Sequence, residues 1–223
     1  MPDVTSGYML EEMRFRDRRD AGRRLAEQVC SLGLDEPFVL ALPRGGVPVG
    51  AEVAKALNAP LDVFIVRKLG VPGHEELAMG AIASGGVRVL NRDVLDYARV
   101  TQQQLDAVAA REERELTRRE AEYRGNRAPL DVRGRTVIIV DDGLATGSTM
   151  RAAVQALRAM KPKRVIVAVP VGAAQTCEDL REIADEIVCL RTPEPFEAVG
   201  LWYDDFTQTT DAEVHALLSR NPQ

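Results

Sequence analysis

Short apolar runs alternate with segments of helical periodicity along most of the chain. Five runs have the length of strands that are buried on both faces: residues 38–42, 61–66, 137–140, 164–169 and 186–190. Four segments repeat apolar residues at the spacing of a helix: residues 15–32, 47–57, 150–161 and 176–184. Strands that alternate with helices form a parallel sheet covered by helices on both faces. The pattern therefore predicts an α/β fold, doubly wound around a mainly parallel central sheet.

The region after the second strand interrupts this alternation. Residues 69–77 are rich in Gly, Pro and charge, which predicts a loop. Residues 78–86 and 87–90 are expected to follow as a short return hairpin. Residues 1–13 are polar, show no apolar pattern and predict no helix or strand.

A long helix is predicted within a helical insertion at residues 91–125. Thr101 and Gln104 have the spacing of a capping box, which marks the start of the helix. Apolar positions on this helix are sparse, so two interpretations stay open: packing across one edge of the sheet, or a dimer contact. A second capping box, Thr210 with Glu213, predicts a last helix.

The sequence VIIVDDGLATGST at residues 137–149 carries the clearest chemistry. Two carboxylates, Asp141 and Asp142, stand where a buried strand ends, and a turn of small residues leads into a helix. Free N–H groups at the start of that helix, together with three hydroxyls, suit a phosphate dianion. Carboxylates repel phosphate, so the acidic pair suits sugar hydroxyls or a bridging Mg²⁺. The expected ligand is a phosphorylated sugar with a free diol.

Two other phosphate-binding motifs do not fit this stretch. A Walker loop requires Lys before its Ser or Thr, and Gly147 occupies that place. A dinucleotide fingerprint places its glycines directly after the strand, where this chain has the acidic pair. The plain alternative is an ordinary turn in which Asp and Gly make local hydrogen bonds.

Residues 137–149 resemble the signature of the type I phosphoribosyltransferases, which bind phosphoribosyl pyrophosphate. The resemblance implies that Asp141 and Asp142 hold the ribose hydroxyls, directly or through Mg²⁺, and stabilise a cationic ribose during catalysis. It implies that the 5′-phosphate is held by Ala145, Thr146, Gly147, Ser148 and Thr149. Hypoxanthine-guanine enzymes have an Asp where this chain has Ala145, so the chain departs from them at that place.

Residues 43–46, Pro-Arg-Gly-Gly, repeat the order of strand, turn and helix earlier in the chain. They resemble the pyrophosphate loop of the same family, in which a non-proline cis peptide is usual, here between Pro43 and Arg44. The resemblance implies that Arg44, Gly45 and Gly46 bind the pyrophosphate.

Arg67 and Lys68 follow the strand at residues 61–66 and resemble the start of the mobile catalytic loop of the family. Both are expected to act in catalysis by neutralising the leaving pyrophosphate. His74 lies in the same predicted loop, either as an incidental surface group or as a catalytic one.

The resemblance implies a small C-terminal hood that stacks on the base, at residues 191–209, and this segment concentrates aromatic residues in a chain that has only 4% of them. Trp202 and Tyr203 suit either stacking on the base or packing within the hood. Asp204, with Asp205 beside it, is the nearest polar candidate for recognising the base, and a carboxylate favours a base with N–H or amino groups. This preference for N–H or amino groups, together with Ala145 in place of the Asp of hypoxanthine-guanine enzymes, favours a purine.

Arginines cluster at the start of the chain, and two interpretations apply to them. In one interpretation the arginines form a solvated helix face, and in the other they bind an anionic substrate. We prefer the first, except for the residues nearest the core. The members of the cluster are Arg14, Arg16, Arg18, Arg19, Arg23 and Arg24.

Composition limits the remaining choices. The 223 residues suit a single domain, residues 1–223, with its core at about 35–190. A net charge of −5 without a basic region argues against nucleic-acid binding. No apolar run reaches membrane-spanning length, and residues 1–10 lack a signal-peptide core. Three scattered cysteines suit a reducing compartment, so a cytoplasmic location is expected.

These features predict a Mg²⁺-dependent phosphoribosyltransferase, with a role in nucleotide salvage. It would transfer the 5-phosphoribosyl group of phosphoribosyl pyrophosphate to a nucleobase and release pyrophosphate, and a homodimer stays open. The alternative is a non-catalytic regulatory protein that senses phosphoribosyl pyrophosphate or a nucleotide, because some proteins keep this fold and ligand site without the activity. A phosphohydrolase fits less well, because no nucleophile and base are paired among the Ser and His residues.

Overall fold

The computed structural model describes residues 14–125 and 127–220; residues 1–13, for which no element is predicted, lie outside that part. The elements follow in the order α2 (Arg18–Cys30), β1 (Phe38–Ala41), α3 (Gly46–Leu57), β2 (Leu61–Val63), β3 (Val66–Val71), β4 (His74–Ala83), β5 (Val87–Leu90), α4 (Arg92–Tyr97), α5 (Gln102–Arg124), β6 (Thr136–Val140), α6 (Ser148–Ala159), β7 (Arg164–Val171), α7 (Ala174–Leu180), β8 (Glu186–Arg191), the short 3₁₀ helix η1 (Val199–Trp202) and α8 (Asp211–Arg220).

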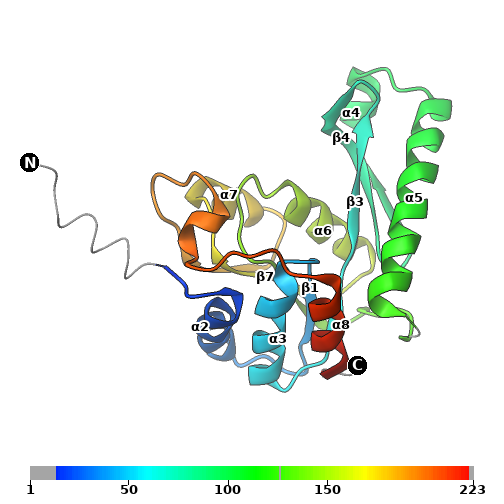
Figure 1. Cartoon of the computed structure of the whole chain (residues 1–223). Helices are drawn as coiled ribbons and strands as arrows, with labels where there is room; N and C mark the ends of the chain where they lie inside the picture. Colours follow the sequence, from blue (N-terminus) through cyan, green and yellow to red (C-terminus); the bar gives the residue numbers. More distant parts are fainter. Residues whose placement is uncertain (1–13, 126, 221–223) are drawn as a thin grey trace, which may run out of the picture.

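A five-stranded parallel sheet in the order β2-β1-β6-β7-β8 forms the centre of the fold. Helices α2, α3 and α8 cover one face, and α6 and α7 cover the other (Figure 1). Successive residues of β6 face opposite sides, so Ile138 joins the first layer and Ile139 the second. Both faces are buried, which explains why the strands are continuous apolar runs. The predicted doubly wound α/β fold is confirmed.

The region between β2 and α4 differs from the expectation. The predicted strand at residues 61–66 is in fact two, β2 in the central sheet and β3 in a separate antiparallel sheet of order β3-β4-β5. The loop predicted at residues 69–77 is wrong, because β3 and β4 pair across a two-residue turn at Pro72 and Gly73. Gly73 has a φ of +79°, which suits glycine in a tight turn. The expected return hairpin is present as β4 and β5.

The antiparallel sheet, α4 and α5 together form an arm that extends from the central sheet, with α5 along one side of the strands (Figure 1). The predicted capping box of α5 is present, and its buried residues include Leu105, Ala109 and Leu116. The structure packs α5 mainly on β3 and β4 of the antiparallel sheet, and only its contact with β2 lies at an edge of the central sheet, where the first interpretation of the insertion placed it. The dimer contact stays a prediction.

An ion pair between half-buried Arg67 and the buried carboxylate of Glu112 joins β3 to α5. Arg67 donates to one carboxylate oxygen of Glu112 from Nε (2.8 Å) and from Nη2 (2.6 Å). Arg111 donates to the other oxygen (2.9 Å). Burial alone would raise the pKa of Glu112, but the bonds from Arg67 and Arg111 hold that pKa below its usual value.

We expect Glu112→Gln to lower the free energy of unfolding by about 1–3 kcal/mol at pH 7, because Arg67 loses its charged acceptor. A carboxyl whose pKa is lower in the folded protein stabilises the fold at pH values above its unfolded-state pKa, 4.5. This stabilisation is lost as the pH falls through the folded-state pKa. Urea unfolding at pH 7 and at pH 3 should therefore show a larger difference at pH 7. Glu113→Gln, at the exposed neighbouring position, is the control. An equal loss at both pH values would contradict the ion-pair explanation.

Candidate active site

The candidate site lies where the direction of strand order reverses. From β1 the chain continues outward to β2, whereas from β6 it continues the other way to β7 and β8. The loops that leave the carboxyl ends of β1 and β6 turn to opposite faces of the sheet. A crevice opens between the two loops, and such a crevice is the usual ligand site of doubly wound sheets. The turn at residues 43–46 and the turn at residues 141–147 both leave this edge.

Glycine is required where these two turns meet. A Cβ on Gly45 would lie 2.0 Å from Oδ2 of Asp142, and one on Gly46 would lie 2.6 Å from the carbonyl oxygen of Val140. No side chain fits at that distance, so the sequence Gly45-Gly46 allows the two turns to be in contact. The peptide bond between Pro43 and Arg44 is cis, as the resemblance implied.

The carboxylates of Asp141 and Asp142 differ in their environment. Asp141 accepts a hydrogen bond from the backbone N–H of Asp142 (2.8 Å). Burial first, and then the charge of Asp142, raise the pKa of Asp141 well above its usual value. Asp142 accepts a hydrogen bond from Nε of Arg18 (2.8 Å), and the two side chains are only 15% and 11% exposed. Asp142 is therefore paired with a cation, whereas Asp141, held close to it, forms no ion pair of its own with any residue that the structure describes.

The turn that precedes α6 has the geometry of a phosphate-binding loop. Gly147 has a φ of +68° and directly precedes the first turn of the helix, whose N–H groups have no partner within the helix. The hydroxyls of Thr146 and Ser148 lie 3.4 Å apart. Thr176 of α7 donates to the carbonyl oxygen of Ala145 (2.7 Å) and so holds the turn from behind.

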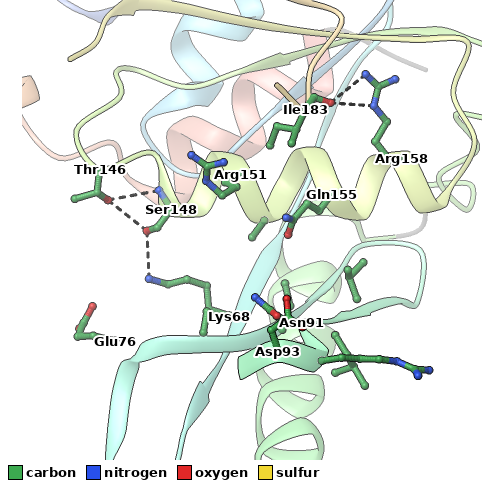
Figure 2. A pocket seen from close by; sticks show the side chains of 17 residues that line it. Lys68, Glu76, Asn91, Asp93, Thr146, Ser148, Arg151, Gln155, Arg158 and Ile183 are labelled. Carbon is green, nitrogen blue, oxygen red and sulfur yellow. Dashed lines mark hydrogen bonds between the residues drawn. The ribbon is translucent and has the colours of Figure 1, made fainter. Parts of the chain in front are cut away.

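Arg67 and Lys68 point to opposite faces of β3, as neighbours on a strand must. Lys68 donates from Nζ to Oγ of Ser148 (3.3 Å), and Figure 2 shows this bond linking the arm to the start of α6. Arg67 instead binds Glu112 on α5. The structure places Lys68 at the start of α6 and Arg67 on Glu112 of the arm, and the expectation that both neutralise the pyrophosphate stays a prediction.

The arm and α6 enclose a cleft next to this turn. Its volume is about 830 Å³, and Lys68, Thr146 and Ser148 lie at one end of it (Figure 2). Gln155 of α6 and Asn91 at the start of α4 approach it from opposite walls. Polar groups therefore continue from the turn along α6.

Arg44 is held on the side of the site that faces α5 and α8. Its Nη1 lies 3.5 Å from Oδ1 of Asp211, and the hydroxyl of Tyr123 donates to the same oxygen (2.7 Å). Arg44 is about one-third exposed, so it remains accessible to an anionic ligand.

In the hood, Trp202 and Tyr203 pack against Phe15 and are only 7% and 3% exposed. This favours hood packing, one of the two interpretations, because their ring faces are covered. The hydroxyl of Tyr203 donates to the carbonyl oxygen of Asp142 (2.6 Å) and fixes the hood on the acidic turn. Phe206 is the hood aromatic that keeps an exposed surface, at 36%.

A family model of the phosphoribosyl transferase domain matches residues 15–204. The chain belongs to this family. Putative phosphoribosyl transferases of two Mycobacterium tuberculosis strains, CDC 1551 and H37Rv, are each 50% identical to it over 206 residues, which is 92% of this chain and 46% of theirs. The chain thus spans about half the length of these curated relatives.

A solved structure extends the comparison. TT1426 from Thermus thermophilus is 46% identical, with a TM-score of 0.88 over 95% of this chain and 100% of that one. The bifunctional protein PyrR of Chloroflexus aurantiacus is 33% identical over 129 residues, 56% of this chain and 65% of that protein. The resemblance drawn from residues 137–149 is confirmed at the level of the family.

Within this phosphoribosyl transferase domain, the expected site residues fall into three groups. The structure brings Asp141, Asp142 and the Gly45–Gly46 turn into direct contact. It places Lys68 at the start of α6. Arg67 is paired with Glu112, and the rings of Trp202 and Tyr203 pack within the hood. Asp204 lies 3.9 Å from Arg14, and Asp205 accepts from Thr207. His74 is exposed at the start of β4, and a catalytic role for it stays untested.

Arg18 is the site residue that the sequence interpretation missed. Its only signal was membership of the arginine cluster, which we interpreted as a solvated helix face except for the residues nearest the core, with anion binding as the alternative.

Among residues 14–125 and 127–220, none of the helices has the length and apolar composition needed to span a membrane.

Replacement of Asp141 and of Asp142 by Asn should shift the Tm in opposite directions. A raised folded-state pKa means that ionising Asp141 costs stability once the pH exceeds the unfolded value of 3.8. Asp141→Asn should therefore raise the Tm at pH 7, where each 1 kcal/mol of stability corresponds to about 2–4 °C in a protein of this size. Asp142→Asn should lower the Tm, because Arg18 loses its charged partner.

Thermal unfolding at pH 7 and pH 3.5 checks this. Near pH 3.5 the gain from Asp141→Asn should shrink, because Asp141 is then largely protonated in both states. A fall in Tm for Asp141→Asn at pH 7 would show that its charge is well compensated in the folded protein.

Proposed function

We propose that this domain transfers the 5-phosphoribosyl group from phosphoribosyl pyrophosphate to a nitrogenous base and releases pyrophosphate. The observation that carries the proposal is the contact between the Gly45–Gly46 turn and the adjacent carboxylates of Asp141 and Asp142. Another turn, which suits a phosphate, leads from these carboxylates into α6. A ribose with a phosphate at one end, a pyrophosphate at the other and a diol between them matches that order of groups. Membership of the phosphoribosyl transferase family supports the same reaction.

Each part of the site has a role in this reaction. Asp141 and Asp142 accept hydrogen bonds from the ribose hydroxyls and oppose the positive charge that develops on the ribose. The start of α6, with Ser148 and Lys68, holds the 5′-phosphate. Arg44 and the backbone of its turn neutralise the departing pyrophosphate. Catalysis then rests on positioning and on preorganised charge.

Mg²⁺ belongs to the proposal as a shared ligand. No group of three or more His, Cys, Asp or Glu that could hold a metal gathers in residues 14–125 and 127–220. Two carboxylates suit Mg²⁺ when substrate oxygens complete its coordination, as is common for this ion. Asp141 and Asp142 would hold it together with the substrate, and it would supply neutralisation of the pyrophosphate charge.

Pyrophosphate release tests the reaction. The protein is incubated with phosphoribosyl pyrophosphate, MgCl₂ and single purine or pyrimidine bases, and release is compared with that of Asp142→Asn. Turnover with at least one base, lost in the variant, is the expected result. Binding of phosphoribosyl pyrophosphate without turnover on any base would favour the regulatory alternative.

The position of Lys68 leads to a prediction about the two phosphate sites. Arg44→Ala should weaken phosphoribosyl pyrophosphate and free pyrophosphate by about tenfold or more, and leave a nucleoside 5′-monophosphate nearly unchanged, since only the first two carry the leaving group. Lys68→Ala should weaken phosphoribosyl pyrophosphate and the monophosphate alike, and spare free pyrophosphate.

Calorimetric titration of each ligand measures these affinities. Lys55→Ala, at the far end of α3, is the control for a general loss of positive charge. If Lys68→Ala weakened free pyrophosphate but not the monophosphate, the original assignment of Lys68 to the pyrophosphate would be right.

A further inference from the structure

Two cysteines meet behind the turn that precedes α6. Cys177 lies on α7 and is only 3% exposed, and Cys189 lies on β8, at the edge of the central sheet. A Cβ on Gly172 would lie 3.0 Å from Sγ of Cys177 and 3.5 Å from Sγ of Cys189, so both sulfurs pack against the same point. The two thiols also share a hydrogen bond. They are therefore in contact, from two different elements of the fold.

This contact makes Cys177 the more nucleophilic of the two thiols. The hydrogen bond between them lowers the pKa of Cys177 and raises the pKa of Cys189. The thiolate is the form of cysteine that reacts with oxidants. Cys189 is only half-buried and lies on an edge strand, so a small oxidant reaches the pair from that side.

The first turn of α7 forms the back of the turn that precedes α6. Thr176, the residue before Cys177, donates to the carbonyl oxygen of Ala145 (2.7 Å). Its Cγ2 lies so close to Gly147 that a Cβ there would be 2.4 Å away. A displacement of Cys177 is therefore transmitted through Thr176 to the backbone of the turn.

We infer that Cys177 and Cys189 form a redox switch, in which peroxide joins them in a disulfide and thereby weakens binding at the turn that precedes α6. Reversible disulfides of this kind are typical of redox sensing in reducing compartments. The identity of the ligand, a sugar 5′-phosphate, rests on the proposed function. The formation of the disulfide does not depend on it.

The oxidation consumes one hydrogen peroxide for each pair of thiols. The Cys177 thiolate attacks one peroxide oxygen, the O–O bond breaks and hydroxide leaves, which gives a sulfenic acid on Cys177. The sulfur of Cys189 then attacks the sulfenic sulfur, and the S–O bond breaks with loss of a second hydroxide. The two thiol protons convert both hydroxides to water. Two thiols are oxidised to one disulfide, and the peroxide is reduced to two waters.

The disulfide should move α7 and not β8. Bond formation brings the two sulfurs closer together than a contact between thiols allows. Strand β8 is held along its length by its pairing with β7, whereas α7 is a helix of only seven residues. The movement therefore draws Cys177 toward β8 and takes Thr176 away from Ala145. The turn then loses the contact that holds it from behind.

Peroxide treatment of the Cys30→Ser protein tests the inference. Cys30 is exposed, and its removal prevents disulfides between molecules. The matched control is Cys30→Ser with Cys189→Ala, which cannot form the disulfide. Peptide mapping by mass spectrometry should show a Cys177–Cys189 disulfide in the first protein after treatment, and dithiothreitol should remove it.

Calorimetric titration of the reduced and oxidised proteins measures the effect on binding. The probes are ribose 5-phosphate, which carries the 5′-phosphate without a base, and free pyrophosphate. Oxidation should weaken ribose 5-phosphate by about fivefold or more and change the affinity for pyrophosphate by less than about twofold. Dithiothreitol should restore the affinity, and peroxide should not change the binding of either probe to the control.

Absence of the Cys177–Cys189 disulfide, or a disulfide that leaves the affinity for ribose 5-phosphate unchanged, would overturn the inference. If neither the reduced nor the oxidised protein binds ribose 5-phosphate, the proposed function fails at this turn. Hydrogen exchange of residues 141–149 then decides about the switch. Faster exchange in the oxidised protein supports it, and equal exchange in the two forms overturns it.

Discussion

The contact between two turns at the carboxyl edge of the central sheet constrains the rest of this structure. Gly45 and Gly46 lie so close to Val140 and Asp142 that neither position has room for a Cβ. This contact requires β1 and β6 to be parallel neighbours with matched ends, and their pairing of Ala41 with Val140 supplies that register. Helices α3 and α6 leave from the same edge of the sheet but cover opposite faces, so the strands between them must be buried on both faces. The apolar strands and the glycine turn therefore serve one geometric purpose.

The central sheet could be predicted from sequence because its signals are local. Each strand is a short apolar run, and each special turn follows directly from one. The arm could not be predicted in this way. Gly70, Pro72 and Gly73 suggested an open loop, but they produce a shift of register and a tight turn within a hairpin. Strand pairing depends on a partner sequence, which composition within one window does not contain.

Arg18 and Trp202 show the same limit at the site. The role of Arg18 depends on contacts with Asp142 and Thr207, which are 124 and 189 positions away in the chain. Helical periodicity around residue 18 reports only which face is buried, and the first turn of a helix lies outside that pattern. Trp202 belongs to an aromatic cluster that composition made visible, yet composition does not distinguish a ring that packs against Phe15 from one that meets a ligand.

The electrostatics of the site are incomplete in the protein alone. Two adjacent carboxylates share one close cation, Arg18, and burial together with the charge of Asp142 raises the pKa of Asp141. Hydroxyl groups of a sugar, which donate hydrogen bonds, would favour the charged form of both carboxylates. Arg18 already occupies one oxygen of Asp142. In the proposed reaction the diol would therefore use the other oxygens of the acidic pair, and Arg18 would limit the position of the sugar relative to the hood.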